Sequence, residues 1–288
     1  MDLVIGLVPA VAWGLLPILA SLHGGRPVNQ IVGTTAGTAL VATVVLFARD
    51  PLISPRVFLF SFLSGACWAV GQLLQYAAYP RIGVSHALPV STAFQLIGTS
   101  LYGVVVLGEW ASVGDKVVGF SALVVIVLGV LLTSVRDPAS REAPRPPRDI
   151  KVGVLMLLVG SLGYVGYSAL PRVADAEGWA AFFPQAGGML ALAVVAALVL
   201  DRGRPLVQPA SWQNLGVGVV FAVGALAYLI SAQVNGIATG FTLTQMSVVL
   251  STLGGIFVLK ERRTPREMAA TVVGLVLVVG GGIAIGRL

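Results

Sequence analysis

A stripe of amide and hydroxyl side chains runs through the apolar segment at residues 84–109. Its members are Ser91, Thr92, Gln95, Thr99 and Tyr102. They fall within roughly one third of a helix circumference, because successive residues of an α-helix are about 100° apart. A glutamine that lies in hydrocarbon without a hydrogen-bond partner is costly, so we expect the stripe to face other helices or a water-filled cavity rather than lipid.

Four other apolar segments carry similar lines of polar and aromatic residues. These lines are Trp68, Gln72, Gln75, Tyr76 and Tyr79; Gln30, Thr34 and Thr38; Ser161, Tyr164 and Ser168; and Phe241, Thr242, Gln245 and Thr252. One interpretation is a shared polar cavity, which the glutamines and the Trp and Tyr residues beside them favour. The alternative is hydrogen bonding between helices, which contributes about 0.6 kcal/mol per bond and explains any single Ser or Thr better.

The chemistry of these lines favours a neutral, hydroxyl-rich substrate such as a sugar. An amide both donates and accepts hydrogen bonds, as the alternating pattern of sugar hydroxyls requires, and an aromatic face suits the C–H face of a sugar ring. A charged substrate would call for charged residues within the membrane. Almost every Lys, Arg, Asp and Glu of this chain lies in a loop or at the end of an apolar segment. This placement weighs against a cation or multidrug exporter that works through an intramembrane acid.

The elements that position these residues belong to an integral membrane protein. Of the 288 residues, 57% are hydrophobic and only 10% are charged, whereas about 25% charged residues is typical of soluble domains. The net charge of +6 does not indicate a nucleic-acid partner, because the basic residues occupy short loops between apolar segments. The single cysteine, Cys67, excludes an intramolecular disulfide. We expect the lipid bilayer to be the partner of the outer surface.

Ten apolar segments of about 20 residues are each long enough to cross a bilayer as an α-helix. They span residues 3–22, 29–48, 56–79, 83–107, 114–134, 151–171, 178–200, 211–232, 235–259 and 266–286. Only one break between them is long, and the Arg and Pro residues of this break predict a solvated linker at 136–150. We therefore expect an all-α membrane protein with two five-helix halves at 1–135 and 151–288.

The two halves share an internal repeat. LIGTSLYGVVVLGE at 96–109 aligns without gaps with VVLSTLGGIFVLKE at 248–261, and five of the fourteen positions are identical. Because each half has an odd number of spans, the second copy is expected to be inverted in the membrane. Inverted repeats are typical of secondary transporters, which bind substrate near the midplane and alternate access between the two sides. A static duplicated scaffold is the alternative interpretation.

Three titratable residues, His86, Glu109 and Glu261, have open roles in the sequence. His86 is the only histidine within a predicted span, which makes it a proton-coupling candidate near neutral pH. On an ideal helix it points about 180° from Gln95, so a packing or interfacial role is the alternative. Glu109 and its repeat equivalent Glu261 are expected either to cap loop backbone or to pair with nearby basic residues such as Lys116.

Several segments together resemble the glucose/ribose porters, a bacterial sugar uptake family of the drug/metabolite transporter superfamily. They are PAVAWG (9–14), GGRPVNQIVGTTAG (24–37), WAVGQLLQ (68–75), GVSHALPVSTAFQLIGTSLYGVVVLGEW (83–110), PQAGGM (184–189) and ATGFTLTQMSVVLSTLGGIFVLKE (238–261). The resemblance implies a multi-pass protein of the bacterial plasma membrane that imports glucose or ribose by proton symport. No cofactor is expected, and no GxxxxGK[ST] motif for ATP is present.

The resemblance also implies which residues line the substrate path. These are Asn29, Gln30, Thr34, Gln72, Gln75, Ser91, Thr92, Gln95, Gln185 and Gln245, to which the polar lines add Trp68 and Tyr76. At position 86 the family commonly has Arg, so His86 departs from its pattern, and this departure weighs against an ionic or coupling role at that position. Family members are generally placed with both termini in the cytoplasm. Thirteen basic residues on the linker side against five on the other predict the opposite orientation by the positive-inside rule.

Other functions remain as alternatives to sugar import. An exporter of amino acids or other small metabolites would share the same superfamily fold, and a sugar sensor would bind without transport. An intramembrane enzyme is disfavoured, because the chain has no HExxH motif and only two histidines, His23 and His86.

Overall fold

The computed structural model describes residues 2–82, 84–135, 150–258 and 263–288. A few side chains within its helices, among them Tyr76 and His86, are outside the description. The predicted linker at 136–149 and Glu261 also lie outside the described residues. The described part of the chain is helical and contains no strand, as its composition predicted.

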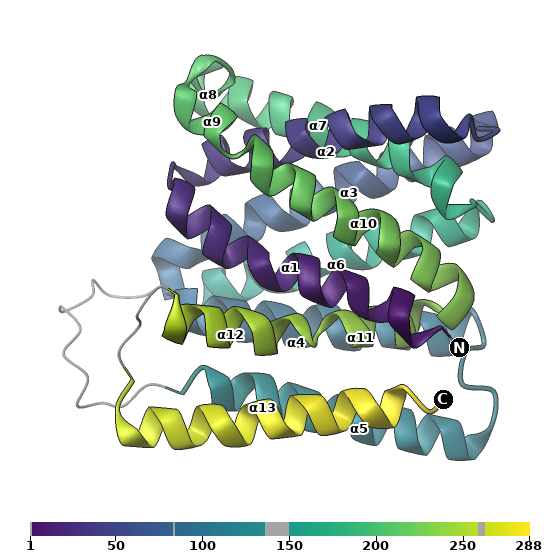
Figure 1. Cartoon of the computed structure of the whole chain (residues 1–288), viewed down its shortest axis with the longest axis vertical. Coiled ribbons are helices and arrows are strands. Elements are labelled where there is room, and N and C mark those ends of the chain that lie inside the picture. Colours follow the sequence, from purple (N-terminus) through teal and green to yellow (C-terminus); the bar gives the residue numbers. More distant parts are fainter. Residues whose placement is uncertain (1, 83, 136–149, 259–262) are drawn as a thin grey trace.

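The helices follow the predicted apolar segments closely (Figure 1). Their bounds are α1 Leu3–His23, α2 Pro27–Arg49, α3 Pro55–Ile82, α4 Val84–Leu101, the π-helix η1 Tyr102–Val106, α5 Val113–Thr133, α6 Ile150–Val173, α7 Gly178–Asp201, α8 Arg204–Val207, α9 Pro209–Gln213, α10 Leu215–Asn235, α11 Ile237–Thr244, α12 Ser247–Phe257 and α13 Pro265–Ile285.

Eight helical segments of the described chain are long and apolar enough to cross a membrane. They are Pro27–Arg49, Pro55–Gln75, Val113–Thr133, Ile150–Val173, Gly178–Asp201, Pro209–Asn235, Ile237–Phe257 and Pro265–Ile285. Two more apolar helices, Leu3–Leu16 and Val90–Val106, are shorter in their described part and fall within the predicted spans 3–22 and 83–107. The prediction of a multi-pass membrane protein is confirmed, and the count of ten spans stays a prediction.

Three segments differ from uniform predicted spans. The sequence YPRIG predicted a break at 79–83, whereas α3 continues to Ile82, because its packing along α6 and α7 outweighs the turn preference of Pro and Gly. The segment 83–107 ends in the π-helix η1 rather than as regular α-helix. The segment 235–259 is divided into α11 and α12, which meet at Gln245 and Met246.

The main helix packings between the two halves come in equivalent pairs. α6 packs against α3 and α4, and α1 packs in the same way against α10 and α12. α7 packs against α3, as α2 does against α10, while α2 and α7 pack against each other. α5 and α13 form a separate pair along one edge of the molecule (Figure 1). Helices at corresponding places in the two halves thus exchange partners, and the inverted repeat itself stays a prediction.

Glycines allow two of these crossings to be unusually close. At Gly65 and Gly188, between α3 and α7, an added Cβ would overlap a backbone carbonyl of the facing helix. The same holds at Gly37 and Gly218, between α2 and α10. Small residues let membrane helices approach until their backbones touch, so dispersion contacts replace the hydrophobic drive that lipid does not supply.

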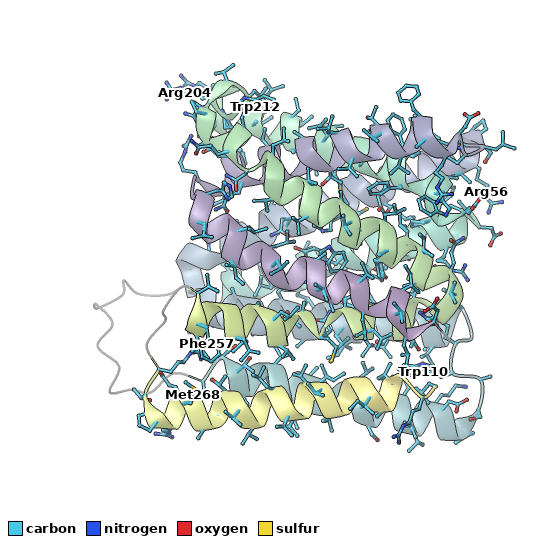
Figure 2. All side chains as sticks on the ribbon, in the orientation of Figure 1. Arg56, Trp110, Arg204, Trp212, Phe257 and Met268 are labelled. Carbon is cyan, nitrogen blue, oxygen red and sulfur yellow. The ribbon has the colours of Figure 1, made fainter. Side chains whose placement is uncertain are left out.

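The two ends of the molecule carry different groups. The N- and C-termini lie at the same end as Arg56 and Trp110, whereas Arg204 and Trp212 lie at the opposite end, on the short helices α8 and α9 (Figures 1 and 2). Exposed apolar side chains in the middle of the helices, such as Val124, Leu162 and Val223, cover the outer surface between these ends. Such a surface matches a bilayer, in which lipid rather than water solvates the helices.

Candidate functional site

The predicted stripes on α3 and α4 meet at Gln75. The side-chain oxygen Oε1 of Gln75 accepts hydrogen bonds from the Ser91 hydroxyl at 2.6 Å and from Nε2 of Gln95 at 3.5 Å. Gln95 also donates to the Ser91 hydroxyl at 2.9 Å. Gln75 and Ser91 are buried, so these bonds form in a medium of low dielectric constant, where they are stronger than in water.

The second half of the chain joins this group through Tyr164 of α6. The Tyr164 hydroxyl lies 3.0 Å from Oε1 of Gln72 and 3.3 Å from Oε1 of Gln75, and it donates to this pair of oxygens. Gln72, Gln75, Ser91, Gln95 and Tyr164 are hereafter called the amide cluster. The cluster joins α3 and α4 of the first half to α6 of the second.

Other members of the α3 and α4 stripes have different surroundings. The Thr99 hydroxyl donates to the carbonyl oxygen of Gln95, one turn earlier in its own helix, at 2.7 Å. Thr92 is half-buried on α4. Trp68 is buried against Phe221 of α10, with ring centroids 4.8 Å apart. Trp68 thus contacts the second half of the chain through its side chain.

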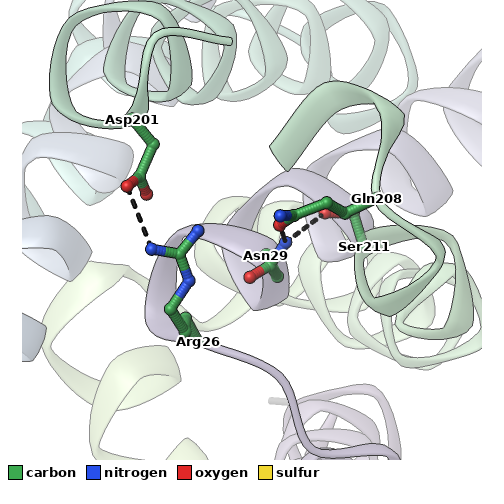
Figure 3. Close-up of polar contacts among 5 residues, drawn as sticks. All are labelled: Arg26, Asn29, Asp201, Gln208 and Ser211. Carbon is green, nitrogen blue, oxygen red and sulfur yellow. Dashed lines mark hydrogen bonds and ion pairs between the residues drawn. The ribbon is translucent and has the colours of Figure 1, made fainter. Parts of the chain in front are cut away.

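The structure does not bring Asn29 to the amide cluster. Its amide Nδ2 donates to Oε1 of Gln208 at 2.7 Å and to the Ser211 hydroxyl at 3.0 Å (Figure 3). Beside it, Arg26 forms an ion pair with Asp201 at 3.0 Å (Figure 3). These contacts attach the start of α2 to the chain that runs from α7 through α9.

Three other predicted residues lie apart from the amide cluster. Gln30 reaches the carbonyl oxygen of Gly24 at 3.5 Å, and the backbone of Thr34 touches Gly218 of α10. Gln245 is buried where α11 meets α12, and its Nε2 donates to the Thr244 hydroxyl at 3.1 Å. The side chains of Tyr76 and His86 are outside the described residues, so their predicted roles stay predictions.

Gln185 of α7 is buried and belongs to a different group of contacts. Its Nε2 donates to the Ser64 hydroxyl of α3 at 2.7 Å, and this hydroxyl donates to the carbonyl oxygen of Tyr167 at 2.7 Å. The side-chain oxygen Oε1 of Gln185 is buried and has no hydrogen-bond partner among the described residues.

Next to this group lies a set of aromatic residues, of which the sequence pattern pointed only to Phe241. Tyr228 of α10 contacts the rings of Trp13, Tyr167 and Phe241, at centroid distances of 5.8, 5.9 and 5.9 Å. Trp13 also stacks on Phe221 at 5.8 Å. The only sequence signal for Trp13 is the PAVAWG segment, and Tyr228 is an isolated tyrosine in an apolar run without any signal.

Glu109 caps backbone, one of the two roles expected for it. Its carboxylate oxygens accept hydrogen bonds from the backbone N–H groups of Ile237 and Ala238, both at 2.7 Å. These are the first residues of α11, where unpaired N–H groups and the helix dipole favour a negative charge. The adjacent Trp110 donates from Nε1 to the Thr239 hydroxyl at 3.1 Å. The contact joins the two halves near the end that holds the chain termini.

A cavity of about 390 Å³ lies beside this contact. It is lined by Glu109, Trp110, Ala111, Asp115, Val234, Asn235, Thr239 and Leu288. None of these residues belongs to the predicted substrate path. The cavity is therefore separate from the amide cluster and the aromatic residues.

The polar groups in the described interior of the protein are neutral. No group of three or more His, Cys, Asp or Glu residues that could hold a metal ion is found in the described part of the chain. Charged residues within the described helices lie in the first or last turns, as Arg56 and Arg81 do in α3. Such an interior suits an uncharged polar molecule better than an ion.

The sequence of this chain is similar to those of bacterial proteins named for sugar uptake. The chain is 43% identical over 287 residues to a protein of Latilactobacillus sakei named "Putative ribose uptake protein RbsU", covering 98% of this chain and 97% of that protein. It is 46% identical over 281 residues to the protein of the same name in Staphylococcus epidermidis, with coverage of 96% and 95%. A Listeria monocytogenes relative named "Putative sugar uptake protein lmo0169" is 42% identical and covers 99% of both chains.

A solved crystal structure shares the fold. It aligns with a TM-score of 0.75 at 17% sequence identity and covers 99% of this chain and 96% of that one. The family model described as "Sugar transport protein" matches residues 4–288. With a match of this extent and relatives above 40% identity along the whole chain, this multi-pass membrane protein belongs to the sugar transport protein family.

Proposed function

We propose that the protein imports a monosaccharide, ribose or glucose, by proton symport. The observation that carries this proposal is the amide cluster, a buried group of neutral donors and acceptors that both halves of a sugar transport family member contribute. The uptake named for the bacterial relatives supports the inward direction. Ribose is the first substrate to test, since the names of two of these relatives specify it.

Alternating access between two inverted repeats is the proposed transport mechanism. The paired packing of α6 on α3 and α4, and of α1 on α10 and α12, supports two exchangeable arrangements of one architecture. Tyr164 lies where these arrangements would differ, because its hydroxyl bonds across from α6 to α3. Sugar bound between the halves would shift the balance of the two arrangements, and the Tyr164 attachment is one contact that would change with it.

Proton coupling is the part of the proposal that rests on the family resemblance. The described helices carry their charged residues near their ends. A coupling proton would therefore bind near the helix ends, away from the midplane of the membrane. Its binding would change the helix contacts at those ends rather than contact the sugar. Uptake driven by an imposed proton gradient tests this part separately from sugar recognition.

The test is uptake of radiolabelled ribose and glucose into proteoliposomes, with and without an inward proton gradient. We expect saturable uptake that rises with the gradient and falls roughly tenfold in Gln95→Ala, which removes two hydrogen bonds of the amide cluster. Thr43→Val is the matched control, because its hydroxyl bonds only to its own helix, at the carbonyl oxygen of Ala39.

The outcomes separate the parts of the proposal. Saturable uptake without any response to the gradient would exclude proton symport and leave sugar transport intact. If neither sugar enters under any gradient, sugar import is wrong, and export of another small metabolite becomes the next function to test.

A further inference from the structure

Several polar atoms in the interior have no hydrogen-bond partner among the described residues. Four of them are Nε1 of Trp13, the hydroxyls of Tyr167 and Tyr228, and Oε1 of Gln185. The side chains of Tyr167, Tyr228 and Gln185 are only 2%, 1% and 1% exposed. Folded proteins seldom leave buried polar atoms unpaired, because each one loses its bonds to water and gains none in return. A group of such atoms indicates that a partner is missing.

These atoms belong to residues that lie close together. Tyr228 contacts Trp13 and Tyr167 directly, and the Tyr167 and Tyr228 rings are nearly parallel, at an interplanar angle of 17°. Near the Tyr228 hydroxyl lies Ser168, whose own hydroxyl is likewise buried and without a partner in hydrogen-bonding geometry among the described residues. Gln185 is connected to the Tyr167 backbone through the Ser64 hydroxyl. We call Trp13, Tyr167, Gln185 and Tyr228 the aromatic cluster.

Both halves of the chain contribute to the aromatic cluster. Trp13 lies at the middle of α1, in the first half, and the other three residues come from α6, α7 and α10 of the second. Trp13 also lies against Gly224 of α10, where a Cβ would stand 2.4 Å from the indole Nε1. The indole Nε1 therefore lies directly against the backbone of α10, about one helical turn before Tyr228.

The unpaired atoms complement a neutral polyol. The indole N–H of Trp13 only donates, Oε1 of Gln185 only accepts, and the two tyrosine hydroxyls do either. Sugar hydroxyls offer donors and acceptors to all of these, and the apolar C–H face of a sugar ring packs against aromatic rings such as those of Trp13 and Tyr228. An ion would find no opposite charge in the cluster, and an apolar ligand would leave the polar atoms unpaired.

We propose that the aromatic cluster is the sugar-binding site, with the Tyr167 and Tyr228 hydroxyls, Trp13 Nε1 and Gln185 Oε1 bonding to hydroxyls of one monosaccharide. This inference rests on the proposed function and refines it, because it separates two roles. The aromatic cluster binds the sugar. The amide cluster is already hydrogen-bonded within the protein and positions α3, α4 and α6 around the site.

The test measures sugar binding to the full-length protein in detergent, by equilibrium dialysis with radiolabelled ribose and glucose. We expect Tyr228→Phe and Tyr167→Phe each to weaken binding of the preferred sugar by roughly tenfold, the effect of one lost hydrogen bond to a buried partner. The melting temperature without sugar is expected to stay at the wild-type value, since neither hydroxyl has a partner in the described protein. Thr43→Val serves as the control for removal of a hydroxyl elsewhere in the membrane region.

The tryptophan offers a second, spectroscopic measurement. We expect sugar to change the fluorescence of the wild-type protein and Trp13→Phe to lose most of that change, even though four other tryptophans remain in the chain. If this variant binds too weakly to saturate, the dialysis measurement at higher sugar concentration still reports its affinity.

The results distinguish this inference from the proposed function. If wild-type protein imports sugar but Tyr167→Phe and Tyr228→Phe bind it with unchanged affinity, the aromatic cluster holds only buried water and the inference is overturned. If sugar binds with the expected losses but is never transported, the inference stands and the transport function fails. Absence of both binding and uptake of either sugar would overturn both.

Discussion

The amide cluster and the aromatic cluster are two polar groups in one apolar interior that differ in hydrogen bonding. In the first, Oε1 of Gln75 accepts several bonds, and Ser91, Gln95 and Tyr164 all bond within the protein. In the second, the hydroxyl of Tyr228 and Oε1 of Gln185 lack partners in the described structure. Burial and polarity alone therefore do not identify a binding site, and the state of the hydrogen bonds separates a structural group from one that awaits a ligand.

The physical reason lies in the asymmetry of buried hydrogen bonds. A satisfied bond contributes about 0.5–1.5 kcal/mol to stability, but a partner left alone after mutation costs about 1–3 kcal/mol. A polar atom without a partner already carries this cost in the ligand-free protein. Removing it should leave stability unchanged or raise it, whereas removing a satisfied atom should lower it. The following variants test this difference, from the largest expected effect to the smallest.

Gln75→Leu is expected to destabilise the protein most, by about 2 kcal/mol, because it leaves the buried Ser91 hydroxyl without its 2.6 Å acceptor. The free energy of unfolding in detergent, followed by circular dichroism against denaturant, measures the change. Gln75→Leu combined with Ser91→Ala should recover much of the loss, since neither partner is then left alone. Equal stability of Gln75→Leu and wild type would show that the amide cluster does not hold the helices together.

Tyr164→Phe is expected to lower stability by about 1 kcal/mol, because its hydroxyl bonds to Gln72 and Gln75 across the two halves. Tyr228→Phe removes the same atom from a site without a hydrogen-bond partner, so it forms the matched comparison. Without sugar, the melting temperature of Tyr164→Phe should therefore be lower than that of Tyr228→Phe measured under the same conditions. The reverse order would contradict the division into two clusters.

Tyr167→Phe is expected to change the stability of the sugar-free protein least, by less than about 0.5 kcal/mol. Saturating sugar should raise the melting temperature of this variant less than that of wild type, because a bound ligand stabilises in proportion to its affinity. A scan with and without ribose provides both numbers in one experiment. An unchanged ribose-induced shift together with a large loss of stability would assign Tyr167 to structure rather than binding.

The helices themselves were largely predictable. The apolar runs at 29–48 and 178–200 became α2 and α7 with ends displaced by a few residues, since a bilayer admits little except continuous helix. The π-helix at Tyr102–Val106 and the division between α11 and α12 were not predictable from hydropathy. A run of apolar residues remains apolar whether its backbone is α-helical, π-helical or interrupted.

The site was predictable only where helical spacing placed several polar residues on one face. This signal found Gln75, Gln95 and Tyr164, which do come together. It missed Trp13 and Tyr228, because a single aromatic residue in an apolar run looks the same whether it packs in a core or meets a ligand. Asn29, selected by resemblance, bonds instead to Gln208 and Ser211 near one end of the molecule.

The sequence by itself determined that the chain is a multi-pass membrane protein with neutral polar groups inside its spans. Both follow from residue type and order, which burial in lipid constrains strongly. Only the tertiary structure decided which of those groups are satisfied. Gln75 and Tyr164 are 89 positions apart in the chain, and a hydrogen bond between them depends on a few tenths of an ångström that no local pattern encodes. The two clusters contain similar chemical groups. They differ in whether residues remote in the sequence come close enough to form hydrogen bonds.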